Sequence, residues 1–164
     1  MSGVLVVFYT RSGNSEKIAH DISTKLNGVI DEITIEKESK GTYGFLKNIF
    51  DAYFENTETI KYEIDPKDYT SIVIVSPVIA GKIPSAVRQY VAENLDKMKN
   101  YGFIMNSNYT ISKKSSKRFR DLMPEAIADF ATKNTDIDFE FYCKSLEDFA
   151  DRIRIVVEKD DRSE

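Results

Sequence analysis

The stretch VLVVFYTRSGNSEKIA, residues 4–19, combines an apolar run, a polar loop and the start of a helical pattern. The run VLVVFY has no polar alternation, which is typical of a strand covered on both faces. The residues TRSGNS that follow carry hydroxyl, amide and glycine groups. From Ser15 onward, apolar residues recur at the spacing of one helical face. A buried strand that leads through a polar loop into a helix predicts an α/β fold.

Length and composition indicate one globular domain. The 164 residues suit a single domain with its own core, which we expect to span residues 1–164. Hydrophobic residues make up 41% of the chain and charged residues 30%, as in ordinary globular proteins. The net charge of −4 argues against nucleic acid as a partner, because phosphate backbones favour basic surfaces.

Targeting signals and cysteine usage predict a cytoplasmic location. The chain begins directly with the strand-like run and lacks the basic start and small-residue cleavage site of a secretory signal. No stretch approaches the roughly 20 apolar residues of a membrane span, so no membrane association is expected. A single cysteine, Cys143, excludes an internal disulfide. With one cysteine and one histidine, we expect no metal site of the usual zinc type.

Short apolar runs predict the strands of a parallel sheet. The continuous runs are VLVVFY (4–9), SIVIVS (71–76) and YGFIMN (101–106). The segment GVIDEITIE (28–36) alternates apolar and polar residues, as an edge strand does. The segment IDFEFYC (137–143) alternates too and is expected at the opposite edge. In that arrangement Cys143 ends the last strand as a small buried residue.

Amphipathic patterns predict helices between these strands. The segments are SEKIAHDISTKL (15–26), PSAVRQYVAENL (84–95), SKRFRDLMPEAIADFATK (116–133) and SLEDFADRIRIVVE (145–158). Pro84 suits a first helical turn, whereas Pro124 predicts a kink or break. Ser145, three residues before Asp148, is an N-cap signal. Because strands and helices alternate, right-handed crossovers predict a three-layer, doubly wound α/β sandwich.

Three loops of unusual composition follow the three most buried strands. They are TRSGNS (10–15), SPVIAGK (76–82) and NSNYTIS (106–112). Each is rich in small or hydrogen-bonding residues, where a plain connection tolerates any composition. In open α/β sheets, ligands bind beyond the carboxyl ends of the strands. We therefore expect the three loops to contribute to one ligand site.

The first loop has the composition of an anion site. It enters a helix N-terminus, where backbone N–H groups lack partners and the helix dipole favours negative charge. Thr10, Ser12 and Ser15 supply hydroxyl groups. Asn14 adds an amide, and Gly13 permits close approach of the backbone. The loop lacks the Walker, dinucleotide and Cys-x5-Arg phosphatase motifs. Phosphate binding is one interpretation, and helix capping by Ser12 or Asn14 is the other.

These loops resemble those of the flavodoxin family, in the same order. TRSGNS is similar to the family loop [TS]-x-[TS]-G-[NT]-[TS], which wraps the FMN phosphate. SPVIAGKIPSAVRQYV resembles the turn and helix that flank the isoalloxazine. GFLKNIFDAYFENTETI (44–60) resembles a segment of small bacterial flavodoxins. The resemblance runs from Val4 to about Val157. It implies a flavodoxin-like, five-stranded parallel sheet in the order 2-1-3-4-5.

The resemblance implies that the protein binds FMN. The cofactor-binding residues would be Thr10, Arg11, Ser12, Gly13, Asn14, Ser15, Pro77, Val78, Ile79, Ala80, Gly81, Lys82, Asn106, Ser107, Asn108 and Tyr109. The first loop would hold the phosphate. A carbonyl between Val78 and Gly81 would accept a hydrogen bond from N5–H of the reduced flavin. Ala80 or Gly81 would ease the peptide rotation that this bond needs.

The implied function is low-potential electron transfer by a monomer. Its partners would be redox proteins, a reductase and an acceptor, because the flavin itself carries the redox chemistry. No catalytic acid, base or nucleophile is required for this role. The alternative is a flavodoxin-like FMN oxidoreductase that reduces quinones or a similar small acceptor.

Two features depart from the family pattern. Ile79 stands where relatives place Trp or Tyr against one face of the flavin. Tyr109 is a candidate stacking ring in the third loop, with surface filling as the alternative. Further candidate rings are Tyr43, Phe45, Phe50 and Tyr53. The basic run KKSSKRFR (113–120) is interpreted as a solvated helix start. Its alternative is a docking patch for an acidic partner or a substrate phosphate.

Overall fold

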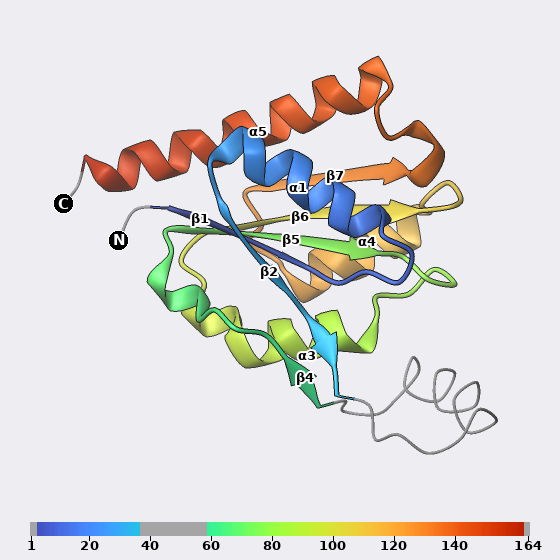
Figure 1. Ribbon diagram of the computed structural model, residues 1–164, viewed down its shortest axis with the longest axis horizontal. Coiled ribbons are helices and arrows are strands. Elements are labelled where there is room, and N and C mark those ends of the chain that lie inside the picture. The colour runs from blue at the N-terminus through green and yellow to red at the C-terminus, as the bar shows by residue number, and fades with distance from the viewer. Residues whose placement is uncertain (1–2, 37–58, 163–164) are drawn as a thin grey trace.

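Five parallel strands form the central sheet in the order β2-β1-β5-β6-β7 (Figure 1). The computed structural model describes residues 3–36 and 59–162. The strands are β1 (Val4–Phe8), β2 (Val29–Glu32), β5 (Ser71–Pro77), β6 (Tyr101–Ser107) and β7 (Ala128–Lys133). Counted along the chain, the strands of this sheet follow the expected order 2-1-3-4-5. The order reverses between β1 and β5, which is where doubly wound sheets bind their ligands.

Helices cover both faces of this sheet (Figure 1). They are α1 (Asn14–Leu26), α3 (Ser85–Asn94), α4 (Lys113–Leu122) and α5 (Glu140–Asp161). Short 3-10 turns are η1 (Pro66–Asp68), η2 (Leu95–Lys97) and η3 (Asn134–Asp136). Helices α1 and α5 pack on one face, and α3 and α4 pack on the other. The predicted three-layer sandwich is therefore confirmed.

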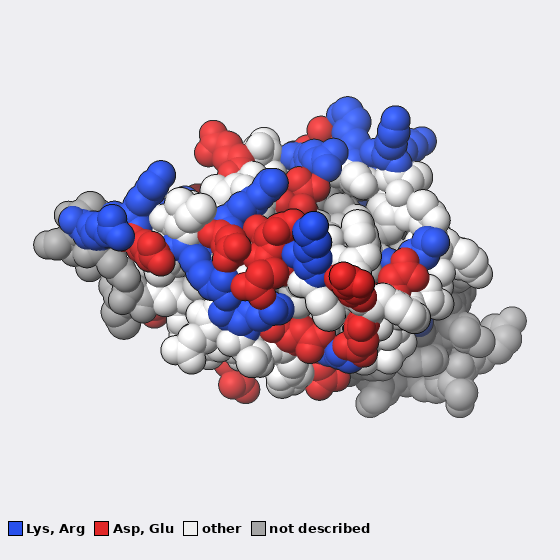
Figure 2. Space-filling view, turned by 90° about the horizontal axis from the view of Figure 1, so that it is seen from above, with Lys and Arg blue, Asp and Glu red and all other residues white. Residues whose placement is uncertain are grey.

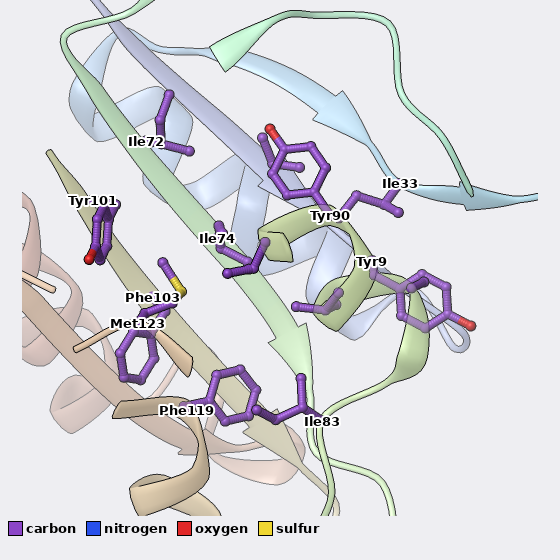
Figure 3. Packing of buried hydrophobic residues seen from close by; sticks show 14 of the residues in the cluster. Tyr9, Ile33, Ile72, Ile74, Ile83, Tyr90, Tyr101, Phe103, Phe119 and Met123 are labelled. Carbon is purple, nitrogen blue, oxygen red and sulfur yellow. The ribbon is translucent and has the colours of Figure 1, made fainter. Parts of the chain in front are cut away.

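The side chains of β1 alternate between two hydrophobic cores. Leu5 and Val7 belong to the core beneath α3 and α4, part of which Figure 3 shows. Val4 and Val6 belong to the core beneath α1 and α5. Every residue of β1 is buried, because both faces of the sheet are covered. An apolar run without polar alternation is what this position requires.

The last strand and the last helix differ from the sequence-based prediction. The fifth strand is β7, paired with β6, and not the segment 137–143. Helix α4 ends before Pro124, which confirms the predicted break, but the rest of the predicted helix over 116–133 forms β7. The segment 137–143 leads into α5, so the helix begins at Glu140 rather than at Ser145. Cys143 is exposed on α5 and not buried.

The burial pattern of α5 explains this correction. Tyr142, Leu146, Phe149 and Ile153 are buried at helical spacing in the core shared with α1. The alternating Phe139 and Phe141, which suggested a strand, lie off this stripe and are exposed. Burial at a period near 3.6 residues outweighs a short alternation of period 2, because it places a long helix on the sheet.

The chain beside β2 forms a second, small sheet. Strands β3 (Thr34–Ile35) and β4 (Ile60–Lys61) pair antiparallel. The buried carboxylate of Asp31 accepts hydrogen bonds from the backbone N–H of Glu63 and Ile64 at 2.9–3.2 Å. These bonds attach the segment after β4 to the edge of the main sheet. The resemblance over 44–60 falls almost entirely outside the described residues.

The face formed by α1 and α5 carries both signs of charge. Figure 2 looks onto this face and shows acidic and basic side chains interspersed. Glu147 of α5 accepts from Lys25 of α1 and, over 2.8 Å, from Arg154 of its own helix, so the Lys25–Glu147 ion pair connects the two helices. Within the described part of the chain, no helix has both the length and the apolar character to cross a bilayer.

Candidate functional site

The carboxyl ends of β1, β5 and β6 bring the three predicted loops to one edge of the sheet (Figure 1, right). Hydrogen bonds show that the loops are in contact. The backbone N–H of Val78 donates to the carbonyl of Asn106 over 2.7 Å, which joins the second loop to the third. Ser15 Oγ donates to Asn106 Oδ1 over 2.8 Å, which joins the first loop to the third. The loops therefore form one candidate site.

No side chain caps the N-terminus of α1. The first intrahelical bond runs from Lys17 N–H to Gly13 C=O over 3.0 Å. The backbone N–H groups of Asn14, Ser15 and Glu16 therefore have no acceptor within the helix. Capping by Ser12 or Asn14, the alternative interpretation of this loop, is not found. The helix end retains its unpaired donors and its positive dipole end, which suits an anion.

The polar side chains of the first loop instead bond within the loop. Thr10 Oγ1 accepts from Gly13 N–H over 3.0 Å, and Asn14 Nδ2 donates to Ser12 Oγ over 3.0 Å. Gly13 has φ = 84°, a conformation that L side chains rarely adopt, and no atom lies within 4 Å of the position a Cβ would take. The loop thus turns sharply and leaves open space beside the helix end.

A chain of side-chain hydrogen bonds holds the first and third loops to the loop after β7. Asn106, only 1% exposed, accepts from Ser15 and donates through Nδ2 to Asn134 Oδ1 over 2.8 Å. Asn134 Nδ2 donates to Asn108 Oδ1 over 2.7 Å. Ser15 is also buried. The side chains of Ser15 and Asn106 therefore hold the loops together, and their contact with a ligand stays a prediction.

The second loop is a tight hairpin. Ile79 and Lys82 exchange two backbone hydrogen bonds of 3.0 and 2.9 Å. The two residues between them, Ala80 and Gly81, have φ of 48° and 72°. Positive φ at both central positions defines a type I′ turn. The turn lies between β5 and α3, and its tip reaches the carboxyl edge of the sheet.

Helix α4 holds the tip of this hairpin. The carbonyl of Gly81 accepts a hydrogen bond from Ser115 Oγ over 3.1 Å and another from Arg118 Nη1 over 2.5 Å. Ser115 is buried and lies 2.9 Å from Ser112 Oγ, and Ser112 caps α4. The second loop and the basic run 113–120 are therefore neighbours in the fold.

Comparison with known proteins identifies the architecture. No protein-family model matches the chain, and no curated protein matches its sequence. Among solved structures, a flavoprotein in complex with FMN from Lactobacillus acidophilus matches at 18% identity, with a TM-score of 0.65 over 84% of this chain and 97% of that one. Oxidised Flavodoxin 1 from Bacillus cereus matches at 14% identity, with a TM-score of 0.56 over 94% and 98%. The chain has a flavodoxin-like fold.

The same flavodoxin-like fold matches part of a larger protein. Rubredoxin oxygen:oxidoreductase from Desulfovibrio gigas matches at 13% identity, with a TM-score of 0.60 over 96% of this chain and 36% of that one. The likeness in all three cases is one of fold, since the identities are low. In this fold, the described loops after β1, β5 and β6 lie at the sheet edge where the strand order reverses.

The second and third loops of the candidate site differ in whether they carry an aromatic side chain. Tyr109, in the third loop, is 81% exposed and has its ring free of the core. Ile79 is half-buried at the base of the hairpin, and Val78 is buried in the core, so Val78 can offer only its backbone. The other candidate rings, Tyr43, Phe45, Phe50 and Tyr53, lie outside the described residues. Among the described loop residues, Tyr109 alone offers an exposed ring.

Most of the predicted site residues come together at this edge. Thr10, Arg11, Ser12, Gly13 and Asn14 form the first loop; Pro77, Ile79, Ala80, Gly81 and Lys82 the second; Ser107, Asn108 and Tyr109 the third. Asn134 was not predicted as part of the site, because the sequence of the preceding strand suggested a helix. The contact of Arg118 with the hairpin was not predicted either. The polar cluster KNTD after an alternating run is the signal that would have indicated a fourth loop.

Helix α1 is further fixed at its open end by α5. Lys17 Nζ donates to Asp138 over 2.7 Å and to Asp21 over 3.0 Å. The hydrogen bond to Asp138 is the largest cause that raises the pKa of Lys17. Burial, assisted by a hydrogen bond to Asp21, raises the pKa of Tyr142. These contacts hold the first loop beside the start of α5.

In the described ranges, no group of three or more potential metal ligands occurs.

Proposed function

We infer that the protein binds FMN and transfers electrons between redox partner proteins. The observation that carries this proposal is the uncapped N-terminus of α1 at the topological switch point. Its free N–H groups, with the hydroxyls of Thr10 and Ser12, fit the terminal phosphate of FMN. The likeness in fold to an FMN-bound flavoprotein supports the same assignment.

The arrangement of the other loops also fits a flavin. The hairpin from Ile79 to Lys82 lies at the site edge with Ala80 exposed at its tip, and Tyr109 offers an exposed ring. FMN, when bound, supplies the redox chemistry, so the protein has to bind and orient it. The first loop would hold the phosphate, while the second and third loops would flank the ring system. This division needs no catalytic acid or base from the chain.

A second candidate function is that of an FMN oxidoreductase acting on quinones or a similar small acceptor. Three observations favour it. The basic helix α4 lies against the hairpin, where it could receive a negatively charged donor. Ile79 stands at the site rim where the resemblance to flavodoxins implies Trp or Tyr, and its smaller side chain leaves more room for a small substrate. A flavodoxin-like unit also matches part of an oxidoreductase.

The proposed location is the cytoplasm. The only cysteine, Cys143, is exposed and unpaired. Exposed free thiols are common in reducing compartments and uncommon in secreted proteins.

The decisive experiment is FMN binding by the purified protein. The apo protein should bind FMN with the absorption change of an immobilised flavin. Ser12→Asp should weaken binding by about tenfold or more, because a carboxylate beside the phosphate repels it. Asn27→Asp is the matched control: it places the same charge at the opposite end of α1 and should leave the affinity unchanged. Failure of the wild-type protein to bind FMN would refute the proposal.

The carrier and the enzyme are separated by their reduction behaviour. An anaerobic titration of the FMN-loaded protein should resolve two one-electron steps if it is a carrier. Direct turnover of NAD(P)H with a quinone, without a second protein, would instead establish the oxidoreductase.

A further inference from the structure

Arg118 of helix α4 donates a hydrogen bond to the hairpin Ile79–Lys82 of the candidate site. The basic residues Lys117 and Arg120 of this helix have acidic partners, Asp121 and Asp129, at 2.7 Å. Arg118 differs, because it donates to a neutral group, the carbonyl of Gly81. Within residues 3–36 and 59–162, Arg118 forms no ion pair. Its positive charge is therefore directed at the hairpin and is not neutralised by a carboxylate there.

The contact between the hairpin and α4 involves two side chains of the helix and one carbonyl. Gly81 adopts φ = 72°, a conformation that L side chains rarely adopt, and the position of a Cβ here lies 3.4 Å from Ser115 Oγ, which is van der Waals contact. The turn therefore packs directly against α4, and glycine suits its backbone conformation. Ser115 is buried and donates to the same carbonyl over 3.1 Å. Two donors from successive turns of one helix therefore fix the orientation of a single peptide group.

The orientation of this peptide matters for a ligand at the site edge. A type I′ turn has few backbone contacts of its own beyond the pair between Ile79 and Lys82. With the Gly81 carbonyl held by α4, the N–H of Lys82 in the same planar peptide group is fixed as well, and this N–H donates to the carbonyl of Ile79 across the turn. A guanidinium, with its rigid planar set of donors, provides this restraint better than a flexible ammonium.

We propose that Arg118 is a positioning residue of the flavin site, which orients the Ala80–Gly81 turn and makes binding of reduced FMN more favourable. This inference rests on the proposed function, since it concerns the same site. Reduced FMN carries more negative charge than oxidised FMN, so a nearby uncompensated cation stabilises the reduced form more. Arg118 thus has two effects: its hydrogen bond restrains the hairpin, and its positive charge favours reduced FMN. Different substitutions of Arg118 test each effect alone.

The restraint is tested on the apo protein by hydrogen exchange of the backbone N–H groups of Ile79 and Lys82. In Arg118→Ala these two groups should exchange about tenfold faster, because the hairpin opens more readily. Arg120→Ala is the matched control, since it removes a neighbouring arginine that pairs with Asp129 at the surface. Unchanged exchange in Arg118→Ala would overturn the inference. Ser115→Ala, which removes the other donor, should also speed exchange.

The charge is tested by comparing the affinities for oxidised and reduced FMN. Arg118→Gln keeps a donor but loses the charge, so the preference for reduced FMN should fall by about fivefold. Arg118→Lys keeps the charge and should preserve that preference, while its hairpin N–H groups exchange faster. Equal preferences in wild type and Arg118→Gln would overturn the electrostatic part. If the wild-type protein binds no FMN, the proposed function fails and the inference fails with it; if FMN binds and Arg118 variants behave like wild type, only the inference fails.

Discussion

Two buried tyrosines differ by one hydrogen bond, which predicts opposite effects of removing their hydroxyl groups. Tyr90, on α3, is fully buried, and within the described residues its Oη has no hydrogen-bond partner. Burial without a partner is unfavourable for a hydroxyl and raises the pKa of Tyr90. Tyr90→Phe should therefore leave the free energy of unfolding unchanged or increase it by about 1 kcal/mol. Urea unfolding measures this change.

Tyr142 provides the matched control. It is 2% exposed, and its Oη donates to Asp21 Oδ2 over 2.8 Å. Tyr142→Phe should lower the free energy of unfolding by about 1–2 kcal/mol, because a bond to a charged acceptor is lost. The interpretation of Tyr90 would be wrong if both substitutions destabilised the protein equally, since that result requires a partner for Tyr90 Oη.

At the residue scale, the sequence identified which residues gather at the site but not where each side chain points. Thr10, Ser12 and Gly13 lie in a loop at an open helix end, as the composition indicated. Ser15 has the same chemistry, but it follows the first helical position and is turned inward, where it bonds to Asn106. The direction of a side chain depends on its phase in the helix and on a partner 91 residues away. A local pattern does not contain that partner.

The hairpin of the second loop predicts an element-scale effect of sequence on stability. Ala80 adopts φ = 48°, which is unfavourable for a residue with a Cβ. Asparagine tolerates this conformation, and Asn-Gly is the favoured pair of a type I′ turn. Ala80→Asn should therefore raise the free energy of unfolding by about 0.5–1 kcal/mol, measured as a higher melting temperature.

Ala80→Val tests the same geometry in the opposite direction. A β-branched side chain is strongly disfavoured at positive φ, so this variant should melt at a lower temperature than wild type. The side chain of Ala80 is exposed, so loss of core packing does not complicate the comparison. Stabilisation by Val and destabilisation by Asn would contradict a type I′ turn at this position.

At the element scale, four of the five main strands were predicted: β1, β5 and β6 because they are buried on both faces, and β2 because its alternating sequence marks an edge strand. Strand β7 was missed because it is an edge strand paired on one side only, and its alanine-rich sequence also suits a helix. Its inward residues Ala128 and Thr132 alternate with the exposed Asp129, a signal too short to outweigh helix propensity. The helical nature of the segment from Glu140 depends on packing against the sheet, which a local alternation does not reveal.

At the scale of the whole molecule, the charges between α1 and α5 predict a dependence of stability on pH. Glu147 bonds to Lys25 of α1 and to Arg154 of its own helix. The hydrogen bond to Lys25, followed by that to Arg154, lowers the pKa of Glu147 below its usual value of 4.5. The folded state thus binds this proton less readily than the unfolded state. The resulting stabilisation is present above pH 4.5 and is lost as the pH falls through the lower, folded-state pKa.

Glu147→Gln isolates this contribution, because it keeps the shape of the side chain and removes its charge. At neutral pH the variant should unfold at a lower urea concentration than wild type, and at a pH low enough to protonate Glu147 in the folded state the two midpoints should converge. Glu158→Gln is the control on the same helix: Glu158 is exposed and its partner Arg162 is 3.9 Å away, so its effect should be small at both pH values. An equal difference between wild type and Glu147→Gln at both pH values would show that packing, not charge, holds α5 against α1. Convergence would instead show that the charge of Glu147 contributes to holding α5 against α1. The same end of the chain, through Asp138, also bonds to Lys17 at the open end of α1.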